Sequence, residues 1–510
     1  MAVVQSFPNG TALCLAHPTN GVVVVSSRTG FSRHALIHRA HGFAVACLLL
    51  VLSPWASADD NAALLDRIDA IRREHGIAAA AVVLVDGDGV LAQRSVGVTD
   101  WDSATPVDAD TRYKVGSVSK AFTAVAMQIA AQQGIVSLDQ PLHQRLANPP
   151  WQNRWRATRP ITLAMLLEHS AGWFDMGRAE FDSADPTPLT LAQALALNPD
   201  ARISQWPPGM HASYSNTGPG VAGHVLEQAS GMSFEAFARR HIFVPLQLHS
   251  ASFLRDAATR RHLAQGYDSD GRTPIPYWHI AYRPAGGLNI SAADMGRFVR
   301  FLLNRGSLDG VRVLDPAQVE RMEHPHTTLA ARHGLMLGYG LGIEASAHRG
   351  HVLFTHGGDG DGYLSRFGYS RESGRGYFVA ITAFNRRAHA AITDAMADWL
   401  VAPLPPVVVA REHALPLKTM QMLVGEYRLA STRFARDGWQ QQILRITLRD
   451  GRLHTQRPGE SAQALIAVDG DLFRREHEAI ASIVLALAAD GSAVLQGPMG
   501  NWQRAVEARK

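Results

Sequence analysis

The first part of the chain changes from a helical pattern of apolar residues to a strand-like one. Apolar residues recur at helical spacing from Asn61 to His75, and Gly76 follows as a stop signal. Two largely apolar runs then flank residues 86–89, Asp-Gly-Asp-Gly, which is typical of a hairpin turn. The runs cover residues 78–85 and 90–98. The pattern predicts an N-terminal helix followed by a two-stranded hairpin.

Strand-like and helical patterns occur again in the stretch that ends at residue 400. Three runs, at 351–356, 363–369 and 377–384, indicate strands, and residues 388–400 have helical spacing. The long stretch between the hairpin and these strands is rich in helical segments. We therefore expect an α/β (α+β) domain at 59–400, with one antiparallel sheet flanked by helices and a separate helical subdomain. The junction between the two subdomains is a common place for a cleft.

The C-terminal part of the chain has a third pattern. A Pro-rich segment at 401–412 predicts a stiff linker. From residue 413 to 510 short strand-like runs are separated by Asp-Gly turns, which predicts a small β-barrel. The expected strands include 425–429, 442–449, 452–456, 464–468 and 483–487.

Residues 1–58 have the composition of a leader. Basic residues extend to Arg39, an apolar run covers 43–52, and Ala56-Ser57-Ala58 precedes two aspartates. This pattern predicts a secretory signal cleaved near Ala58, and hence an exported protein, periplasmic or secreted. The apolar run is too short to span a bilayer well, so we expect no membrane span in the mature chain.

The charge balance argues against a nucleic-acid partner. Lys and Arg total 49 and Asp and Glu total 45. The leader holds three of the arginines and no acid, which leaves the remaining chain with 46 basic and 45 acidic residues. Without a strong basic field, binding to phosphate backbones is not expected.

Ser117 and Lys120 form the strongest chemical signal. They lie three residues apart where an extended stretch at 111–116 gives way to a helical one, so the hydroxyl and the amine can meet on one face. Only four residues in the chain are lysine, while arginine is common. Because a guanidinium cannot lose its proton in a protein, a retained lysine is a candidate for a base that activates serine.

Two further motifs follow in order. Tyr214-Ser215-Asn216 precedes a predicted helix near 221–230, and His356-Gly357-Gly358 ends a predicted strand. Taken alone, Asn216 could merely cap the helix, and the glycine pair could be a tight turn with an incidental histidine. Their order and spacing after Ser117 favour a functional interpretation.

Together these motifs resemble the serine β-lactamase and penicillin-binding-protein family, whose signature is S-x-x-K followed by S-D-N and K-T-G. The Tyr-x-Asn form is similar to the class C β-lactamase, D-aminopeptidase and esterase branch. The resemblance runs from about Asn61 to Leu400, and the C-terminal barrel resembles the lipocalin-like domain that follows many hydrolases of this branch. Other segments that carry it are 166–172, 207–209, 245–246, 285–288 and 338–342.

The resemblance implies a β-lactamase/transpeptidase-like fold and catalysis through an acyl-enzyme. It makes Ser117 the nucleophile, Lys120 the base, and Tyr214 the group that protonates the leaving group and activates water. It makes Asn216 a substrate-binding residue. No cofactor and no metal are expected.

The third motif supplies the remaining expected substrate-binding residues. His356, Gly357 and Gly358 form the strand side of the site, and the backbone N–H of Asp359 would pair with that of Ser117 as an oxyanion hole. His356 replaces the lysine that helps to hold a substrate carboxylate in β-lactamases, and histidine is mostly neutral at pH 7. We expect weak β-lactamase activity at most.

The sequence thus predicts a serine hydrolase acting on a small-molecule ester, amide or peptide, of the esterase or D-amino-acid peptidase type. Two alternatives stay open. One is a β-lactamase or D,D-carboxypeptidase acting on peptidoglycan-type substrates, and the other is a non-catalytic periplasmic binder of cell-wall fragments. His169 lies in a segment typical of the family, and we expect it to be a structural hydrogen-bonding residue. The oligomeric state does not follow from the sequence.

Overall fold

The structure is a computed structural model that describes residues 58–146, 149–181, 183–488 and 491–504, all of them within one compact unit. The predicted leader, apart from Ala58, lies outside the described residues. None of the described helices is both long and apolar enough to cross a membrane.

A seven-stranded antiparallel sheet is the centre of the first domain, in the order β2-β1-β11-β10-β9-β8-β7. Its hairpin β1–β2 comes from the start of the chain, and β1 pairs with β11 from the far end, with Ala80 opposite Ile381. The strands are β1 (Ala79–Asp86), β2 (Val90–Gly97), β7 (Gly338–Tyr339), β8 (Glu344–His348), β9 (His351–Gly360), β10 (Tyr363–Tyr369) and β11 (Arg375–Ile381).

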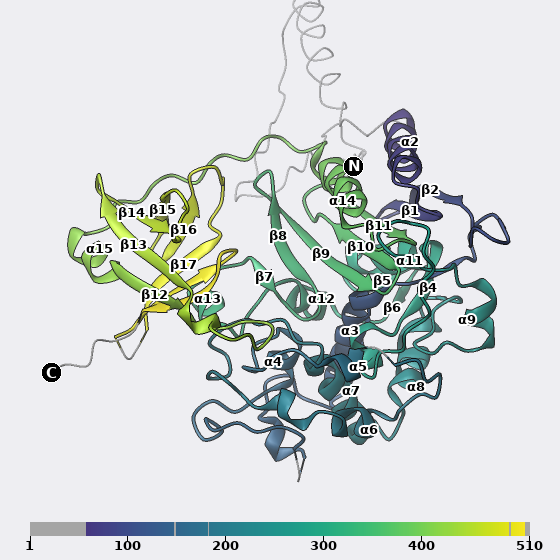
Figure 1. The fold of residues 1–510 in the computed structure, drawn as a ribbon, viewed down its shortest axis with the longest axis horizontal. Coiled ribbons are helices and arrows are strands. Elements are labelled where there is room, and N and C mark those ends of the chain that lie inside the picture. The colour runs from purple at the N-terminus through teal and green to yellow at the C-terminus, as the bar shows by residue number, and fades with distance from the viewer. Residues whose placement is uncertain (1–57, 147–148, 182, 489–490, 505–510) are drawn as a thin grey trace, which may run out of the picture. The chain divides into compact units, whose positions relative to one another are not determined.

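Helices cover both faces of this sheet, which explains why β1 is apolar without alternation. Val82 and Leu84 pack with Ile68 of α2 (Ala58–Glu74) and Met396 of α14 (Arg386–Val401). Their neighbours on the opposite face, such as Val83, pack with α11 (Ala292–Leu303). Figure 1 shows α2 and α14 side by side over the sheet.

The helical subdomain lies between β3 and β7 in the chain, and α3 (Ser119–Gln132) is its central helix, buried from Ser119 to Ala130. The other helices and short turns are α4 (Leu163–Leu167), α5 (Arg178–Phe181), α6 (Leu191–Ala196), α7 (Thr217–Ser230), α8 (Phe234–Ala238), α9 (Ala257–His262), α10 (Arg283–Gly286), α12 (Pro316–Glu323) and α13 (Leu329–Arg332), with η1 (Gly116–Val118), η2 (Leu142–Gln144), η3 (Pro199–Arg202) and η4 (Arg239–Phe243). Two small ribbons pair β3 (Arg112–Lys114) with β4 (Asn289–Ser291) and β5 (Ser307–Leu308) with β6 (Val311–Arg312).

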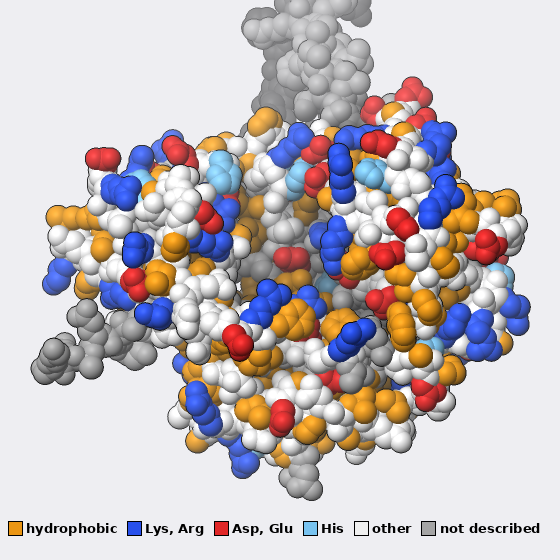
Figure 2. Space-filling view, in the orientation of Figure 1, with side chains coloured by type: hydrophobic (Ala, Val, Ile, Leu, Met, Phe, Trp, Pro, Cys, Tyr) orange, Lys and Arg blue, Asp and Glu red, His pale blue; other side chains and the backbone are white. Residues whose placement is uncertain are grey.

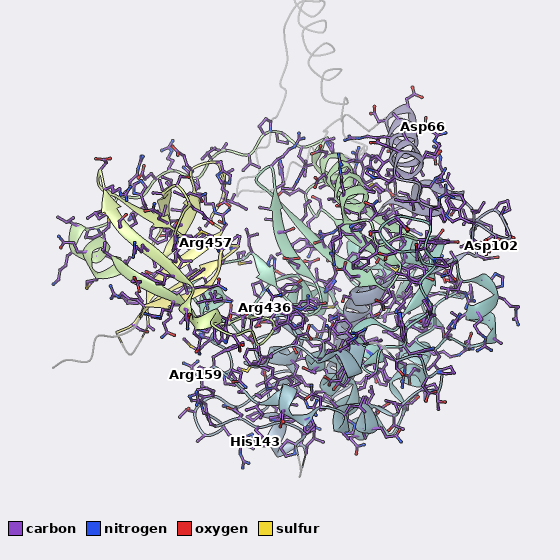
Figure 3. All side chains as sticks on the ribbon, in the orientation of Figure 1. Asp66, Asp102, His143, Arg159, Arg436 and Arg457 are labelled. Atoms are coloured by element: carbon purple, nitrogen blue, oxygen red, sulfur yellow. The ribbon has the colours of Figure 1, made fainter. Side chains whose placement is uncertain are left out.

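The C-terminal domain is a closed eight-stranded barrel, β12 to β19. Tyr427 and Trp502 fill its core, and Arg457, labelled in Figure 3, lies over the Trp502 ring at 5.4 Å. The elements are α15 (Leu417–Leu423), β12 (Gly425–Leu429), η5 (Trp439–Gln441), β13 (Ile443–Arg449), β14 (Arg452–Gln456), β15 (Gln463–Asp469), β16 (Leu472–Arg475), β17 (Ile483–Leu487), β18 (Ala493–Gly497) and β19 (Gly500–Arg504).

The observed architecture confirms the predicted fold class of an antiparallel sheet with helices, followed by a barrel. Helix α15 was not anticipated from the pattern of the chain.

The barrel is hydrogen-bonded to the first domain through buried groups. Gln496 of β18 donates to the carbonyl of Met210 at 2.7 Å and accepts from the N–H of Ala330 at 2.7 Å. Asn501 of β19 donates to the carbonyl of Ala212 at 2.8 Å. These contacts hold the barrel next to residues 210–213, which lead into the Tyr214 motif.

Candidate active site

Ser117 lies in the middle of the short turn η1, two residues before α3 begins. The turn packs directly against β9, because Gly116 has a φ of +50° and a Cβ there would lie 2.4 Å from the carbonyl oxygen of Asp359. On the strand, a Cβ on Gly358 would lie 1.9 Å from the carbonyl oxygen of Val115. Two glycines therefore allow the backbones beside Ser117 and Asp359 to touch.

Lys120 is fully buried on the first turn of α3, and its amine lies 2.9 Å from Ser117 Oγ. Two acceptors flank the same nitrogen: Asn216 Oδ1 at 2.6 Å and the carbonyl oxygen of Ala285 at 2.7 Å. Burial lowers the pKa of Lys120 well below its usual value, because the charged form loses its hydration.

Asn216 is buried before α7 and does not cap that helix with its side chain. Its backbone N–H donates to Asp175 Oδ1 at 2.7 Å, and its side-chain amide donates to Asp175 Oδ2 at 3.0 Å. The amide is therefore oriented with its oxygen toward Lys120, which fixes the geometry around the amine.

Arg433 is a residue of the C-terminal domain that contacts the site. It lies in the loop after β12, and Arg436 of the same loop is labelled in Figure 3. The Nε of Arg433 donates to Asp175 Oδ2 at 2.8 Å. The Asp175 side chain is fully buried, whereas that of Arg433 is 44% exposed. The guanidinium also lies over the Tyr214 ring, 4.8 Å from its centroid. Neither Asp175 nor Arg433 was identified from the sequence as a site residue.

The Tyr214 ring lies close to the Lys120 amine, the Arg433 guanidinium and the His169 ring. The Lys120 amine is 4.9 Å from the ring centroid, and the His169 ring is 4.4 Å away. Burial raises the pKa of Tyr214, and a hydrogen bond with Ser117 and the charge of Arg433 only partly oppose that effect. His169 accepts the backbone N–H of Ser215 at 3.2 Å, which is a structural contact of the kind expected from the sequence.

His356 is buried on β9, with its Nδ1 2.6 Å from the carbonyl oxygen of Gly357. Burial, followed by the charge of Lys120, lowers its pKa to about 3, so the ring is neutral at neutral pH. Its ring centroid lies 6.4 Å from that of Tyr214 and 5.9 Å from that of Tyr339.

Ser117 opens into a cavity of about 200 Å³. Asn216, Asp359 and Arg433 line this cavity together with Ser117. The other expected site residues lie behind the lining: Lys120, Tyr214, His356, Gly357 and Gly358. The apolar wall of the cavity contains Phe181, Ile280 and Phe384. The structure thus brings the expected residues from three distant segments together, with the third motif contributing mainly through the backbone next to Asp359.

The visible surface carries charges of both signs. Figure 2 shows blue arginine and lysine side chains interspersed with red carboxylates over this face. Among the described residues, no group of three or more His, Cys, Asp or Glu side chains is arranged to hold a metal ion.

Known proteins resemble this chain in sequence over its first domain. The family model described as Beta-lactamase matches residues 64–402. Penicillin-binding protein 4 of Amycolatopsis lactamdurans is 30% identical over 52% of this chain and 69% of its own length. A Beta-lactamase of Yersinia enterocolitica is 28% identical over 44% of this chain, and the match spans 55% of that relative.

Solved structures share the fold. The octameric penicillin-binding protein homologue from Pyrococcus abyssi superposes with a TM-score of 0.58 at 20% identity, covering 87% of this chain and 100% of that one. SurE superposes with a TM-score of 0.57 at 22% identity, covering 88% of this chain and 100% of that one. Because the family model matches more than half of the chain, the chain belongs to the Beta-lactamase family, which is part of the superfamily of serine hydrolases that includes the β-lactamases and the penicillin-binding proteins.

Proposed function

We propose that this protein is a serine hydrolase that acts on an ester or amide through an acyl-enzyme on Ser117. The observation that carries this proposal is the set of contacts around Lys120. A neutral amine has two N–H groups and one lone pair, and Asn216 and Ala285 offer one acceptor each. The lone pair is then left for the third neighbour, the Ser117 hydroxyl at 2.9 Å.

The charge states support Lys120 as the base. Burial lowers the pKa of Lys120 and raises that of Tyr214, so a neutral amine beside a neutral phenol is the favoured resting pair. In the proposed reaction Lys120 takes the proton of Ser117 as its oxygen attacks the carbonyl carbon. Tyr214 then passes a proton to the leaving group, and later relays the proton of the water that hydrolyses the acyl-enzyme.

The oxyanion of the tetrahedral intermediate would lie between the backbone N–H groups of Ser117 and Asp359, which both line the cavity. Asn216 would hold the substrate amide or carbonyl. His356 would support the strand side as a neutral ring, since its pKa of about 3 makes it a poor partner for a carboxylate.

Esterase or D-aminopeptidase activity is the preferred type, and the leader sequence supports export. A solved structure of SurE with D-Leu, 21% identical with a TM-score of 0.56, keeps D-residues among the candidate substrates. Arg433 favours a second candidate, a β-lactamase or D,D-carboxypeptidase, because it supplies beside Ser117 the positive charge that His356 lacks.

The test combines labelling with turnover. The protein is treated with a fluorophosphonate and its intact mass is measured, while hydrolysis of p-nitrophenyl acetate, D-alanine p-nitroanilide and nitrocefin is assayed. One adduct that maps to Ser117, with turnover lost in both Ser117→Ala and Lys120→Arg, is the expected result. Lys120→Arg is the informative variant because it keeps the charge and removes the free amine. A folded protein that gives neither adduct nor turnover would instead be a binding protein.

A further inference from the structure

A second cavity of about 390 Å³ adjoins the one that contains Ser117. Lys114 and Ile280 line both cavities, and Gly286 of the first is followed in the chain by Gly287 of the second. Because Lys114 precedes Ser117 by three residues, their Cα atoms are at most about 10 Å apart. A substrate bonded to Ser117 can therefore extend into the second cavity.

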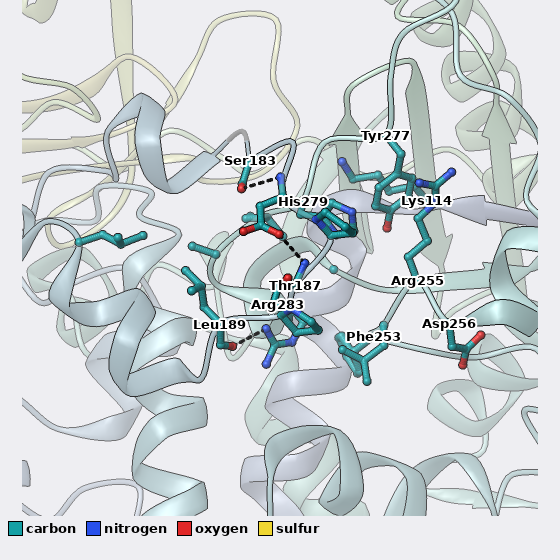
Figure 4. Close-up of a pocket in the computed structure, with 18 residues that line it drawn as sticks. Lys114, Ser183, Thr187, Leu189, Phe253, Arg255, Asp256, Tyr277, His279 and Arg283 are labelled. Carbon is teal, nitrogen blue, oxygen red and sulfur yellow. Dashed lines mark hydrogen bonds between the residues drawn. The ribbon is translucent and has the colours of Figure 1, made fainter.

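One side of the second cavity is apolar, and the other carries a cationic cluster on an aromatic ring. Leu189, Phe253 and Leu254 belong to the apolar lining. On the cationic side the Lys114 amine lies 4.9 Å, and the Arg255 guanidinium carbon 4.6 Å, from the centroid of the Tyr277 ring. Figure 4 shows these two cations gathered around Tyr277, away from Leu189.

The two acidic side chains that line this cavity, Asp185 and Asp256, accept hydrogen bonds from nearby backbone N–H groups. Asp256 caps α9 by accepting the N–H of Thr259 at 2.7 Å, and Figure 4 shows its carboxylate turned away from Tyr277. Asp185 accepts the N–H of Thr187 at 2.8 Å within its own loop. Neither carboxylate is paired with Arg255.

The other cations have protein partners. Arg283 pairs with Glu235 at 2.5 Å and also donates to the carbonyl of Leu189. Lys114 donates to the carbonyl of Trp278 at 2.8 Å. Arg255 differs, because within the described part of the chain it makes no ion pair, and its Nε is buried there without a hydrogen-bond partner. A guanidinium of this kind fits a carboxylate, which accepts two parallel hydrogen bonds.

The two ends of the substrate can be distinguished. The leaving group must face Tyr214, which would protonate it, and Arg433 covers that side. Arg433 lines the first cavity and not the second. The acyl portion is then the part that extends past Lys114.

We propose that the second cavity binds the acyl portion of the substrate, and that Arg255 binds a carboxylate at the end of that acyl chain. This inference rests on the proposed function and names its substrate class: esters or amides of an acyl group with an anionic end. Tyr277 holds the guanidinium in place, and the apolar wall accepts the methylene groups of the chain.

The test compares two esters of equal acyl length, p-nitrophenyl hexanoate and the mono-p-nitrophenyl ester of adipic acid, with p-nitrophenyl acetate as a short reference. The expected result is a kcat/KM about tenfold higher for the adipate ester, mainly through KM, as a charge-assisted hydrogen bond provides. Arg255→Gln should abolish that preference and leave turnover of the acetate within about twofold of the parent protein. Arg261→Gln, an exposed arginine on α9, is the matched control and should keep the preference.

Failure of this inference differs from failure of the proposed function. Equal turnover of the two long esters, or a preference that survives in Arg255→Gln, would overturn the inference while the acetate is still hydrolysed. If no ester is turned over, calorimetric titration of Ser117→Ala with the amides that correspond to the two long esters decides the matter. Tighter binding of the adipate amide that Arg255→Gln removes supports the carboxylate site, and equal binding refutes it.

Discussion

Replacing Arg433 by methionine should shift the pH dependence of the reaction toward higher pH. Lys120 can act as a base only when it is neutral, and Arg433 lowers its pKa while Asp175 raises it. Arg433→Met removes the charge that lowers this pKa and leaves Asp175 in place, because Asn216 still donates hydrogen bonds to its carboxylate. The pKa of Lys120 must then rise.

The size of the shift in the pKa of Lys120 follows from its distance to Arg433, which is limited because both cations lie close to the Tyr214 ring. The Arg433 guanidinium lies 4.8 Å and the Lys120 amine 4.9 Å from its centroid, so the two charges are at most about 10 Å apart. At that separation and an effective dielectric constant of about 20, their repulsion is about 1.7 kcal/mol. This energy corresponds to about 1.2 pKa units, and because Arg433 is 44% exposed, solvent screening reduces the expected shift to about one unit.

The assay is kcat/KM against pH with p-nitrophenyl acetate, a neutral ester that needs no carboxylate site. The acid limb of the profile should move up by about one pH unit in Arg433→Met and down in Asp175→Asn. The double variant should lie near the parent protein, because it removes both charges. An Arg433→Met protein with lower activity but an unmoved acid limb would refute the electrostatic argument and leave Arg433 with a packing role only.

Three further predictions concern the fold around the site. Gly358→Ala should prevent the contact with Val115 and abolish both activity and a cooperative thermal transition, whereas Gly89→Ala, where a Cβ meets nothing within 4 Å, should retain both. The pKa of His356 is about 3 in the folded protein and about 6.5 in the unfolded chain. The free energy of unfolding should therefore fall as the pH drops from about 6.5 toward 3, by at most about 1.4 kcal/mol per pH unit. Urea unfolding at several pH values should show a smaller dependence of this free energy on pH in His356→Gln. Gln496→Leu leaves a buried N–H and a carbonyl without their partner, so we expect a loss of about 2 kcal/mol and faster proteolysis between the domains in a limited trypsin digest.

Local patterns were sufficient for much of the fold. The strands β10, β12, β14 and β17 have the bounds that the pattern of apolar residues and turn residues predicts. The hairpin β1–β2 was recognisable from its four turn residues. Helix α15 was missed because its seven residues are too short to display a helical period against a neighbouring Pro-rich segment.

The candidate site also contains residues that the sequence predicts and residues that it does not. Ser117 and Lys120 are three residues apart, so local helical geometry was enough to expect their contact. Asp175 and Arg433 are separated by 258 residues and belong to different domains. No periodicity or spacing links such residues, and an arginine in a chain rich in arginine carries no signal of its own. Their pairing is a product of tertiary packing.

The pairing of β1 with β11 affects the nascent chain during its synthesis. Ala79 is joined to Thr382 by a hydrogen bond across 303 residues, so the apolar strand β1 has no partner on that side until nearly the whole domain has been synthesised. At typical translation rates the delay is roughly 15–60 s. Throughout it, a run of alanine, valine and leucine presents an open edge of the kind that recruits other chains. A fragment that ends before β11 would keep this edge of β1 unpaired, so we expect it to aggregate where the complete domain does not.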